Sequence, residues 1–246
     1  MSSVRGIGRF GNQVIRSLCA SLFCRKHNLF VDYKFKKEIE KLGVKLFVGK
    51  KKHKESIILT DDNYFENYNK ELNKNIKTTA YFQTKKITDF LHSYLNEKKV
   101  MKEVMEKNKF KNRYNNNEDC FIHIRLGDVE KYNPGFEYYD KILNEIKCKN
   151  IYISTDSLDH DIIKKLTQKY KIQIVDKSLD EIILFGSTCK FVILSYGTFS
   201  ALIGYLSYYS YVYCLKYCKQ YAWDFDKGFN MFNDKKTKIK DWIIRD

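Results

Sequence analysis

The sequence predicts an α/β protein built from two parallel-sheet domains. In the second half, short apolar strands alternate with single helices, the order that forms a doubly wound sheet. The first half opens with a glycine-rich turn, a helix and an apolar strand. Between the halves, Asn112 to Asp119 is polar and has no periodicity. We therefore expect an N-terminal domain over residues 1–115 and a C-terminal domain over residues 116–246.

The composition is that of a globular chain. Its 246 residues are 43% hydrophobic and 15% aromatic, enough for a substantial core and unlike a disordered protein. Residues 1–5 lack the apolar run of a signal peptide, and no run of about 18 apolar residues follows, so we expect no transmembrane segment and a cytoplasmic location.

The seven cysteines are odd in number and form no C-x-x-C pair, which favours buried thiols over disulfides or zinc.

The net charge of +15 is concentrated in the first half. Residues 1–118 hold 26 Lys and Arg against 13 Asp and Glu, whereas residues 119–246 hold 19 against 17. Lys34 to Lys54 is the densest part. The lysines fit either a solvated surface or attraction to an anionic partner, which includes a nucleotide, an acidic glycan, a lipid head group or a nucleic acid.

The N-terminal turn has the glycine spacing G-x-G-x-x-G from Gly6 to Gly11. A helix is predicted from Val14 to His27, followed by a strand from Leu29 to Tyr33 that carries Asp32. This order matches the dinucleotide-binding fingerprint, although few residues precede Gly6 to form a first strand. A plain tight turn is the other interpretation. If the turn binds a ligand, whether a dinucleotide or another anion, the free N–H groups at the helix N-terminus favour its negative charge.

The rest of the first half is less regular. We expect a charged helix after Phe35, short strands at 44–48, 57–59 and 79–83, a polar helix over 63–73 and a long helix over 88–107.

The stretch from Phe121 to Asp128 reads as a buried strand that ends in polar groups. With a side-chain period of two, Ile122, Ile124 and Leu126 face one side, and Phe121, His123 and Arg125 face the other. Ligands of open α/β sheets bind beyond the carboxyl ends of the strands, and a guanidinium suits phosphate. The alternatives are that Arg125 pairs with a neighbouring carboxylate and that His123 is a satisfied core histidine.

The remaining second half alternates regularly. Strands are predicted at 151–154, 172–175, 191–194 and 211–215, and helices at 137–147, 158–169, 179–187 and 198–208. Two strands end in hydroxyl-rich segments, 154–157 and 195–200. The second places Ser and Thr at a helix N-terminus, which forms either a phosphate cradle or a simple N-cap.

Five motifs, taken together, resemble those of the α-1,2-fucosyltransferases of glycosyltransferase family 11. They are G-R-F-G-N-Q at 8–13, Y-F-Q at 81–83, H-I-R-L-G-D at 123–128, S-T-D at 154–156 and S-Y-G-T-F-S at 195–200. The first also resembles protein O-fucosyltransferases. Leu126 replaces the second Arg usual in the central motif, and Ala201 and Leu202 replace the usual tryptophans.

The resemblance implies a GT-B-like fold of two Rossmann-like domains facing a cleft. It implies that the C-terminal domain binds GDP-fucose, that the N-terminal domain holds a glycan acceptor, and that neither metal nor cofactor is needed. The basic first half favours an anionic or membrane-proximal acceptor. The expected substrate-binding residues are Gly8, Arg9, Phe10, Gly11, Asn12, Gln13, Gln83, Asp156, Ser195, Thr198, Phe199 and Ser200.

The expected reaction is transfer of fucose with inversion, through an oxocarbenium-like transition state. Arg125 is expected to stabilise the leaving β-phosphate, and Asp128 or His123 to act as general base. Two other classes stay open: an NAD(P)-dependent oxidoreductase, which uses the glycine turn and Asp32, and a basic nucleic-acid-binding module. No RNA-recognition signature or zinc finger supports the latter, so we expect no nucleic-acid partner.

Overall fold

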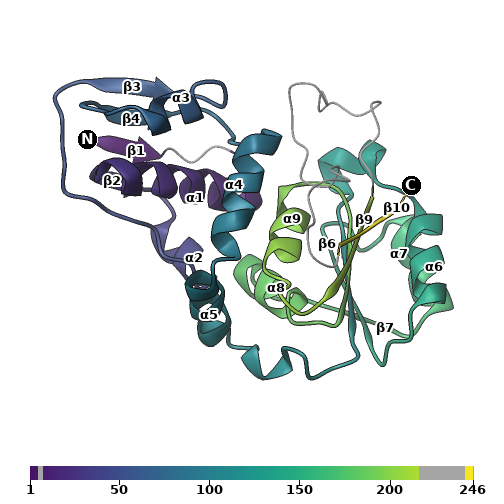
Figure 1. Cartoon of the computed structure of the whole chain (residues 1–246). Coiled ribbons are helices and arrows are strands. Elements are labelled where there is room, and N and C mark those ends of the chain that lie inside the picture. Colours follow the sequence, from purple (N-terminus) through teal and green to yellow (C-terminus); the bar gives the residue numbers. More distant parts are fainter. Residues whose placement is uncertain (5–7, 216–241, 246) are drawn as a thin grey trace. The chain divides into compact units, whose positions relative to one another are not determined.

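The computed structural model describes residues 1–4, 8–215 and 242–245. Within this part, the chain forms two compact units, which we call unit 1 (residues 1–104) and unit 2 (from residue 105). The division therefore lies ahead of the polar segment in which we placed the domain boundary. Each unit has its own parallel sheet with helices, so the α/β class predicted from the sequence is confirmed (Figure 1).

Unit 1 contains a four-stranded parallel sheet in the order β2-β1-β4-β3. Its strands are β1 (Ser2–Val4), β2 (Val31–Tyr33), β3 (Ser56–Leu59) and β4 (Asn75–Thr78). Its helices are α1 (Phe10–His27), α2 (Lys36–Glu40), α3 (Tyr64–Asn69), α4 (Lys85–Leu95) and α5 (Lys98–Lys107), whose last residues enter unit 2. Buried apolar side chains run along most of α1, which supports the sheet.

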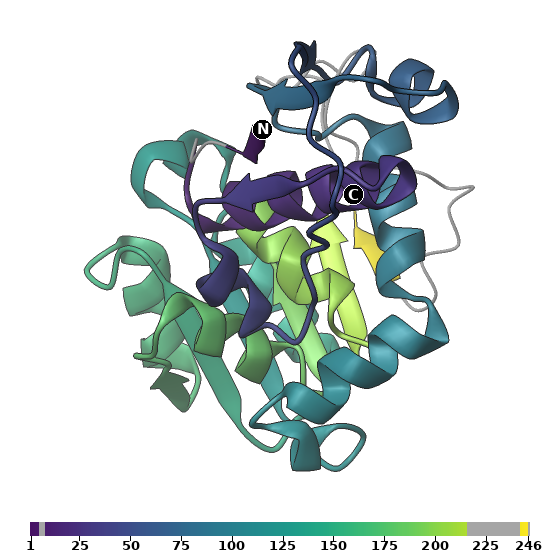
Figure 2. The same cartoon turned by 90° about the vertical axis from the view of Figure 1, so that its left-hand side faces the viewer.

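Three expectations for unit 1 were wrong in detail. Residues 44–48 form no strand: the chain there runs as a separate segment across the unit (Figure 2), and the main chain of Phe47 bonds to the side chains of Ser21 and Tyr33 and not to a strand. The fourth strand lies at 75–78, and the apolar residues at 79–83 form a loop that buries Phe82. The long helix is two helices that meet at Asn96 and Glu97.

Unit 2 contains a six-stranded parallel sheet in the order β10-β9-β8-β5-β6-β7. Its strands are β5 (Cys120–Ile124), β6 (Ile151–Thr155), β7 (Ile172–Ile174), β8 (Phe191–Leu194), β9 (Tyr211–Leu215) and β10 (Trp242–Arg245). The predicted strands are confirmed within a residue or two, and β10 was not predicted. Chain order reverses between β5 and β8, which marks the switch point of a doubly wound sheet.

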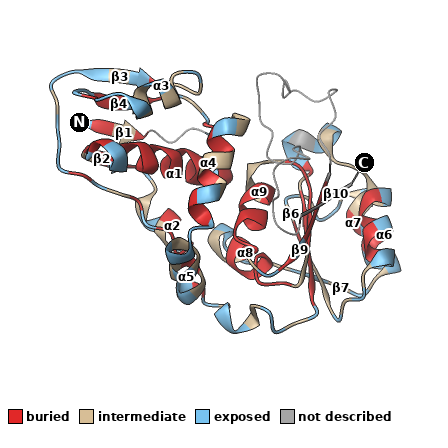
Figure 3. Cartoon of the chain, viewed as in Figure 1, coloured by how far each residue is buried: buried red, intermediate tan, exposed pale blue. Residues whose placement is uncertain are grey.

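Helices cover both faces of this sheet. They are α6 (Phe136–Glu145), α7 (Asp161–Lys169), α8 (Leu179–Gly186) and α9 (Thr198–Tyr205), with short 3₁₀ turns at Lys111–Arg113 and Gly127–Tyr132. Ile122, Ile124 and Leu126 join the core with α6 and α7. Phe121 instead contacts Phe185 of α8, and His123 contacts Phe199 of α9. The predicted alternation of β5 is therefore confirmed, and its residues are buried (Figure 3).

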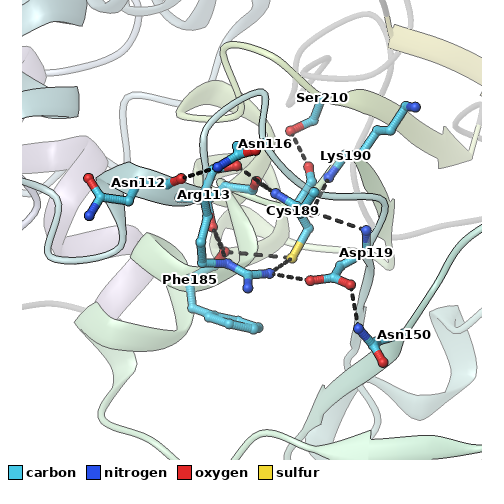
Figure 4. Close-up of polar contacts among 11 residues, drawn as sticks. Asn112, Arg113, Asn116, Asp119, Asn150, Phe185, Cys189, Lys190 and Ser210 are labelled. Atoms are coloured by element: carbon cyan, nitrogen blue, oxygen red, sulfur yellow. Dashed lines mark hydrogen bonds and ion pairs between the residues drawn. The ribbon is translucent and has the colours of Figure 1, made fainter.

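The polar segment before β5 is fastened to unit 2 rather than free. The Arg113 guanidinium donates to Asp119 at 2.7 Å and to Thr188 at 3.2 Å, and it lies 4.5 Å from the Phe185 ring centroid (Figure 4). Asn150, which precedes β6, donates to the other oxygen of Asp119 at 2.7 Å. Asp119 and Asn150 immediately precede β5 and β6, so the network ties the segment to the amino edge of the sheet.

The described part of the chain contains no helix that is long and apolar enough to cross a membrane.

Candidate functional site

The candidate site of unit 2 lies at the carboxyl ends of β5 and β8. His123 is within β5 and Arg125 follows it, whereas Ser195 follows β8 and Ser200 lies in the first turn of α9. The Ser195 hydroxyl accepts the backbone N–H of Arg125 at 2.9 Å, which joins the two strand ends. The sheet order thus brings together residues some 70 positions apart in sequence.

Arg125 is held between two carboxylates. Its Nη2 lies 2.5 Å from Oδ1 of Asp128, and its Nη1 lies 3.2 Å from Oδ2 of Asp156. The pairing that we considered as an alternative is therefore present. The Arg125 side chain is 18% exposed and that of Asp128 is 57% exposed, so an incoming anion could replace Asp128 at small cost.

Asp156 fixes the turn that follows β5. Its Oδ1 accepts the backbone N–H of Leu126 at 2.8 Å, while its Oδ2 faces Arg125. A Cβ at Gly127, where φ is +21°, would lie 2.8 Å from Oδ2 of Asp156, so a side chain at this position would push the carboxylate away from Arg125. Glycine at this position therefore permits the Asp156–Arg125 pair.

His123 is buried against α9. Its Nδ1 lies 2.5 Å from Oγ of Ser200, and that hydroxyl lies 3.3 Å from Oγ of Ser195. Burial lowers the pKa of His123 to about 4, with a further lowering from the Arg125 charge and a smaller opposite effect from Asp156. The imidazole is therefore neutral at pH 7. His123 is thus a buried histidine with a hydrogen-bond partner, which is the alternative that we considered from the sequence.

This burial predicts a pH effect on stability. The unfolded chain binds a proton on His123 near pH 6.5 and the folded chain only near pH 4, so stability is lost as pH falls between these values, by up to about 3 kcal/mol. We expect His123→Asn, which keeps a polar group near Ser200, to lose less stability than wild type between pH 7 and about 5. Thermal unfolding at both pH values measures this, and equal losses in the two proteins would contradict it.

The first turn of α9 lies beside these groups. Gly197 precedes the helix with φ +106°, and a Cβ there would meet no atom within 4 Å, so the strain of a side chain would be conformational. The ring of Phe199 lies 5.0 Å from that of His123, while Thr198 begins the helix half-buried. Tyr196 stacks on Tyr132 at 5.2 Å. Neither tyrosine was a predicted site residue, and an aromatic after a strand gives no specific sequence signal.

A second polar cluster lies at the carboxyl edge of the unit 1 sheet. Gly8 follows β1, and Gln83 follows β4, its neighbour in the sheet. Nε2 of Gln83 donates to Oδ1 of Asn12 in the first turn of α1 at 2.7 Å. Oε1 of Gln83 is buried without a hydrogen-bond partner in the described residues. Two predicted motifs of unit 1 therefore meet.

Two residues that were not predicted belong to this cluster. Oδ1 of Asp61, which follows β3, accepts the backbone N–H of Gln83 at 2.9 Å. Arg16 is fully buried, and its Nη2 donates to the Thr78 carbonyl at 3.1 Å. Burial lowers the pKa of Arg16, while the charges of Tyr81 and Asp61 oppose this. A charged residue within the apolar helix α1 is the sequence signal that could have indicated Arg16.

The other residues of the glycine turn have different surroundings. Gln13 is buried and donates to the Gly8 carbonyl at 2.7 Å, which closes the turn. Gly11 is buried, Phe10 is half-buried and Arg9 is exposed at the start of α1. Gly6, the first glycine of the dinucleotide fingerprint, lies outside the described residues. Asp32, its acidic member, is exposed within β2.

Metal-binding groups are not gathered in the residues that the structure describes: no three His, Cys, Asp or Glu side chains are placed to hold an ion there. The sequence has two Asp-x-Asp pairs, Asp159 with Asp161 and Asp224 with Asp226. His160, between the first two, lies 2.8 Å from a carboxylate oxygen of Glu130, and the second pair lies outside the described residues. The described cysteines are free thiols, and Cys218 lies outside them.

Comparison with solved structures gives distant matches. A mutant of Arabidopsis thaliana FUT1 in complex with GDP matches with a TM-score of 0.48 and 13% identity, over 86% of this chain and 69% of that one. POFUT1 in complex with GDP matches with a TM-score of 0.42 and 11% identity, over 83% and 94%, and POFUT1 in complex with GDP-fucose with 0.38 and 10%, over 83% and 94%. No protein-family model matches the chain, and no curated protein matches it.

Proposed function

We propose that this chain is a glycosyltransferase that moves fucose from GDP-fucose to a glycan hydroxyl. The observation that supports this most is the switch point of unit 2, where Arg125, Ser195 and Ser200 gather at the ends of β5 and β8. In doubly wound sheets this is where a nucleotide binds. The motifs at 123–128, 154–156 and 195–200, which resemble those of fucosyltransferases, all converge there.

The residues of unit 2 would share the work of donor binding. Arg125 would turn from Asp128 to the β-phosphate, while Asp156 keeps its other guanidinium nitrogen in place. The first turn of α9, with the half-buried Thr198, offers N–H and hydroxyl donors to phosphate oxygens, whereas the hydroxyl of Ser200 is buried against His123. In unit 1, Gly8 to Asn12 and Gln83 would contact the sugar or the acceptor.

In the proposed reaction, the acceptor oxygen attacks the anomeric carbon as the bond to the β-phosphate breaks. GDP leaves with the bonding electrons, and the acceptor proton passes to a base. Asp128 is the better candidate because its side chain is 57% exposed, whereas the His123 imidazole is buried. His123 would act as a positioning residue for Ser200. Inversion, the α-1,2 linkage and independence from a metal belong to this proposal, and the cytoplasmic location stays a prediction.

A ligand panel tests the donor assignment. At one hundred times its dissociation constant a ligand stabilises by about 2.7 kcal/mol, which for a chain of this size raises Tm by roughly 5–10 °C. We expect GDP and GDP-fucose to produce this shift and UDP and NADH to produce none. Release of GDP from GDP-fucose in the presence of a glycan then tests transfer. A shift with NADH and none with GDP would instead support the oxidoreductase.

A further inference from the structure

The most basic part of the chain lies in unit 1, and its second half is attached to the sheet of that unit. We call residues 34–54 the basic segment, with nine lysines against two glutamates. The next stretch, 56–75, holds two lysines against four acidic residues, so a general enrichment in lysine does not explain the contrast. A local excess of this size requires a local explanation.

Main-chain hydrogen bonds fasten the second half of the basic segment. The Gly49 N–H donates to the Leu29 carbonyl at 2.9 Å, and the N–H of Lys51 donates to the Asn28 carbonyl at 2.8 Å. A Cβ at Gly49 would lie 2.4 Å from the Asn28 carbonyl carbon, so this approach requires glycine. The His53 N–H donates to Oδ1 of Asn75 at 3.1 Å.

These contacts place Lys50, Lys51 and Lys52 at the amino edge of the sheet, whereas Lys34, at the start of the basic segment, directly follows β2 at the carboxyl edge. Asn28 and Leu29 precede β2, and Asn75 is the first residue of β4. The cluster of Asn12 and Gln83 lies at the carboxyl edge, which is the other end of the same strands. The lysines that surround Gly49 are therefore not part of the Asn12 and Gln83 cluster of unit 1.

The basic segment is exposed and its lysines are not neutralised within the described chain. Its exposed lysines are Lys34, Lys37, Lys41, Lys45, Lys50, Lys51, Lys52 and Lys54, and none of them forms an ion pair with a described residue. Of the nearby acids, Glu55 pairs with Lys74, and Glu40 accepts the backbone N–H of Leu46. One or two cations would suffice to complement the C-terminal dipole of α1, so most of this charge has no internal role.

Apolar groups lie among these cations. Val48 is 39% exposed next to Gly49, and the Lys52 ammonium lies 4.2 Å from the centroid of the half-buried Phe30 ring. Every cation in the basic segment is a lysine, a point charge without the planar fork that arginine offers to individual phosphates. Lysines around exposed apolar groups suit a lipid surface, where charge meets head groups and apolar atoms enter the interface.

We propose that the basic segment docks unit 1 on a membrane surface that contains anionic lipid. The proposal does not depend on the activity of the candidate site. In this proposal the chain binds the membrane peripherally, through its surface. Each lysine near an anionic leaflet contributes roughly a fivefold factor in affinity.

Vesicle sedimentation tests this proposal with a matched pair of variants. Phosphatidylcholine vesicles with about 30% phosphatidylserine should bind the chain, and vesicles without it should not. The triple variant K50Q/K51Q/K52Q should bind about 100-fold more weakly, at unchanged Tm because the segment is fastened by main-chain atoms. The control K147Q/K149Q/K171Q removes the same charge from exposed positions of unit 2 and should bind like wild type.

Each other outcome overturns the proposal. Equal losses in the two triple variants would mean that net charge alone drives binding. An oligonucleotide that displaces the chain from vesicles through the same lysines would assign the face to nucleic acid. Val48→Ser should weaken binding to vesicles and leave binding to oligonucleotides unchanged. Unchanged vesicle binding would remove the apolar contact on which the assignment to a lipid surface depends, and would so overturn the proposal.

Discussion

Arg125→Ala is expected to lower kcat for transfer from GDP-fucose by about 100- to 1000-fold, the loss typical when a donor to developing negative charge is removed. KM for the acceptor should change little, because the guanidinium would act on the leaving group. Steady-state kinetics with saturating donor, followed by GDP release, measures both values.

Two further variants give this prediction its control. Arg125→Lys keeps the charge but cannot contact Asp156 and a phosphate together in the same way, so it should recover only part of the rate. Lys131→Ala removes an exposed cation from the 3₁₀ turn that carries Asp128 and should leave the rate near wild type. Full activity in Arg125→Ala would remove the basis of the proposed function.

Arg113→Ala is expected to destabilise unit 2 by about 3 kcal/mol, because it leaves the carboxylate of Asp119 buried with part of its charge uncompensated. The Asp119 side chain is 6% exposed and keeps only the bond from Asn150 on its other oxygen. Burial raises the pKa of Cys189 to about 12 despite the nearby guanidinium, so the sulfur at 3.5 Å is a neutral thiol and cannot replace the carboxylate as partner.

Hydrogen exchange of the β5 and β8 amides reports this loss for unit 2 alone, which matters in a chain with two units. Lys190→Ala is the matched control: it breaks the ion pair with Glu118, whose side chain is 56% exposed, and should cost less than about 1 kcal/mol. Equal protection factors in wild type and Arg113→Ala would show that the amino-edge network contributes nothing.

The strands from β5 to β9 and the helices between them could be predicted because they alternate in separate, strongly patterned segments, whereas β10 was missed. The face of each β5 residue followed from the period of two, and the convergence of His123, Arg125 and Ser195 followed from strand ends in a parallel sheet. The partners of those residues did not follow. The strand pattern does not encode the loop geometry that pairs Asp156 with Arg125. Nor does it encode the hydrogen bond between Ser200 and His123.

Unit 1 was harder for two physical reasons. Its strands have three or four residues, too few for a period to be read, and apolar residues in loops imitate strands. Phe82, with φ +56°, is buried in a loop beside Tyr64, and the apolar residues at 44–48 pack without pairing. Asp61 and Arg16 joined the cluster through the fold of the sheet, not through any local motif.

The attachment of residues 49–53 separates the shape of this surface from its chemistry. All the hydrogen bonds that hold it come from main-chain atoms of the segment, so Gly49 is constrained while Lys50, Lys51 and Lys52 are free to vary. Mutation can therefore tune the electrostatic potential of this face, or invert it, without disturbing the architecture beneath. Related chains could share the same scaffold and differ in the surfaces on which they reside.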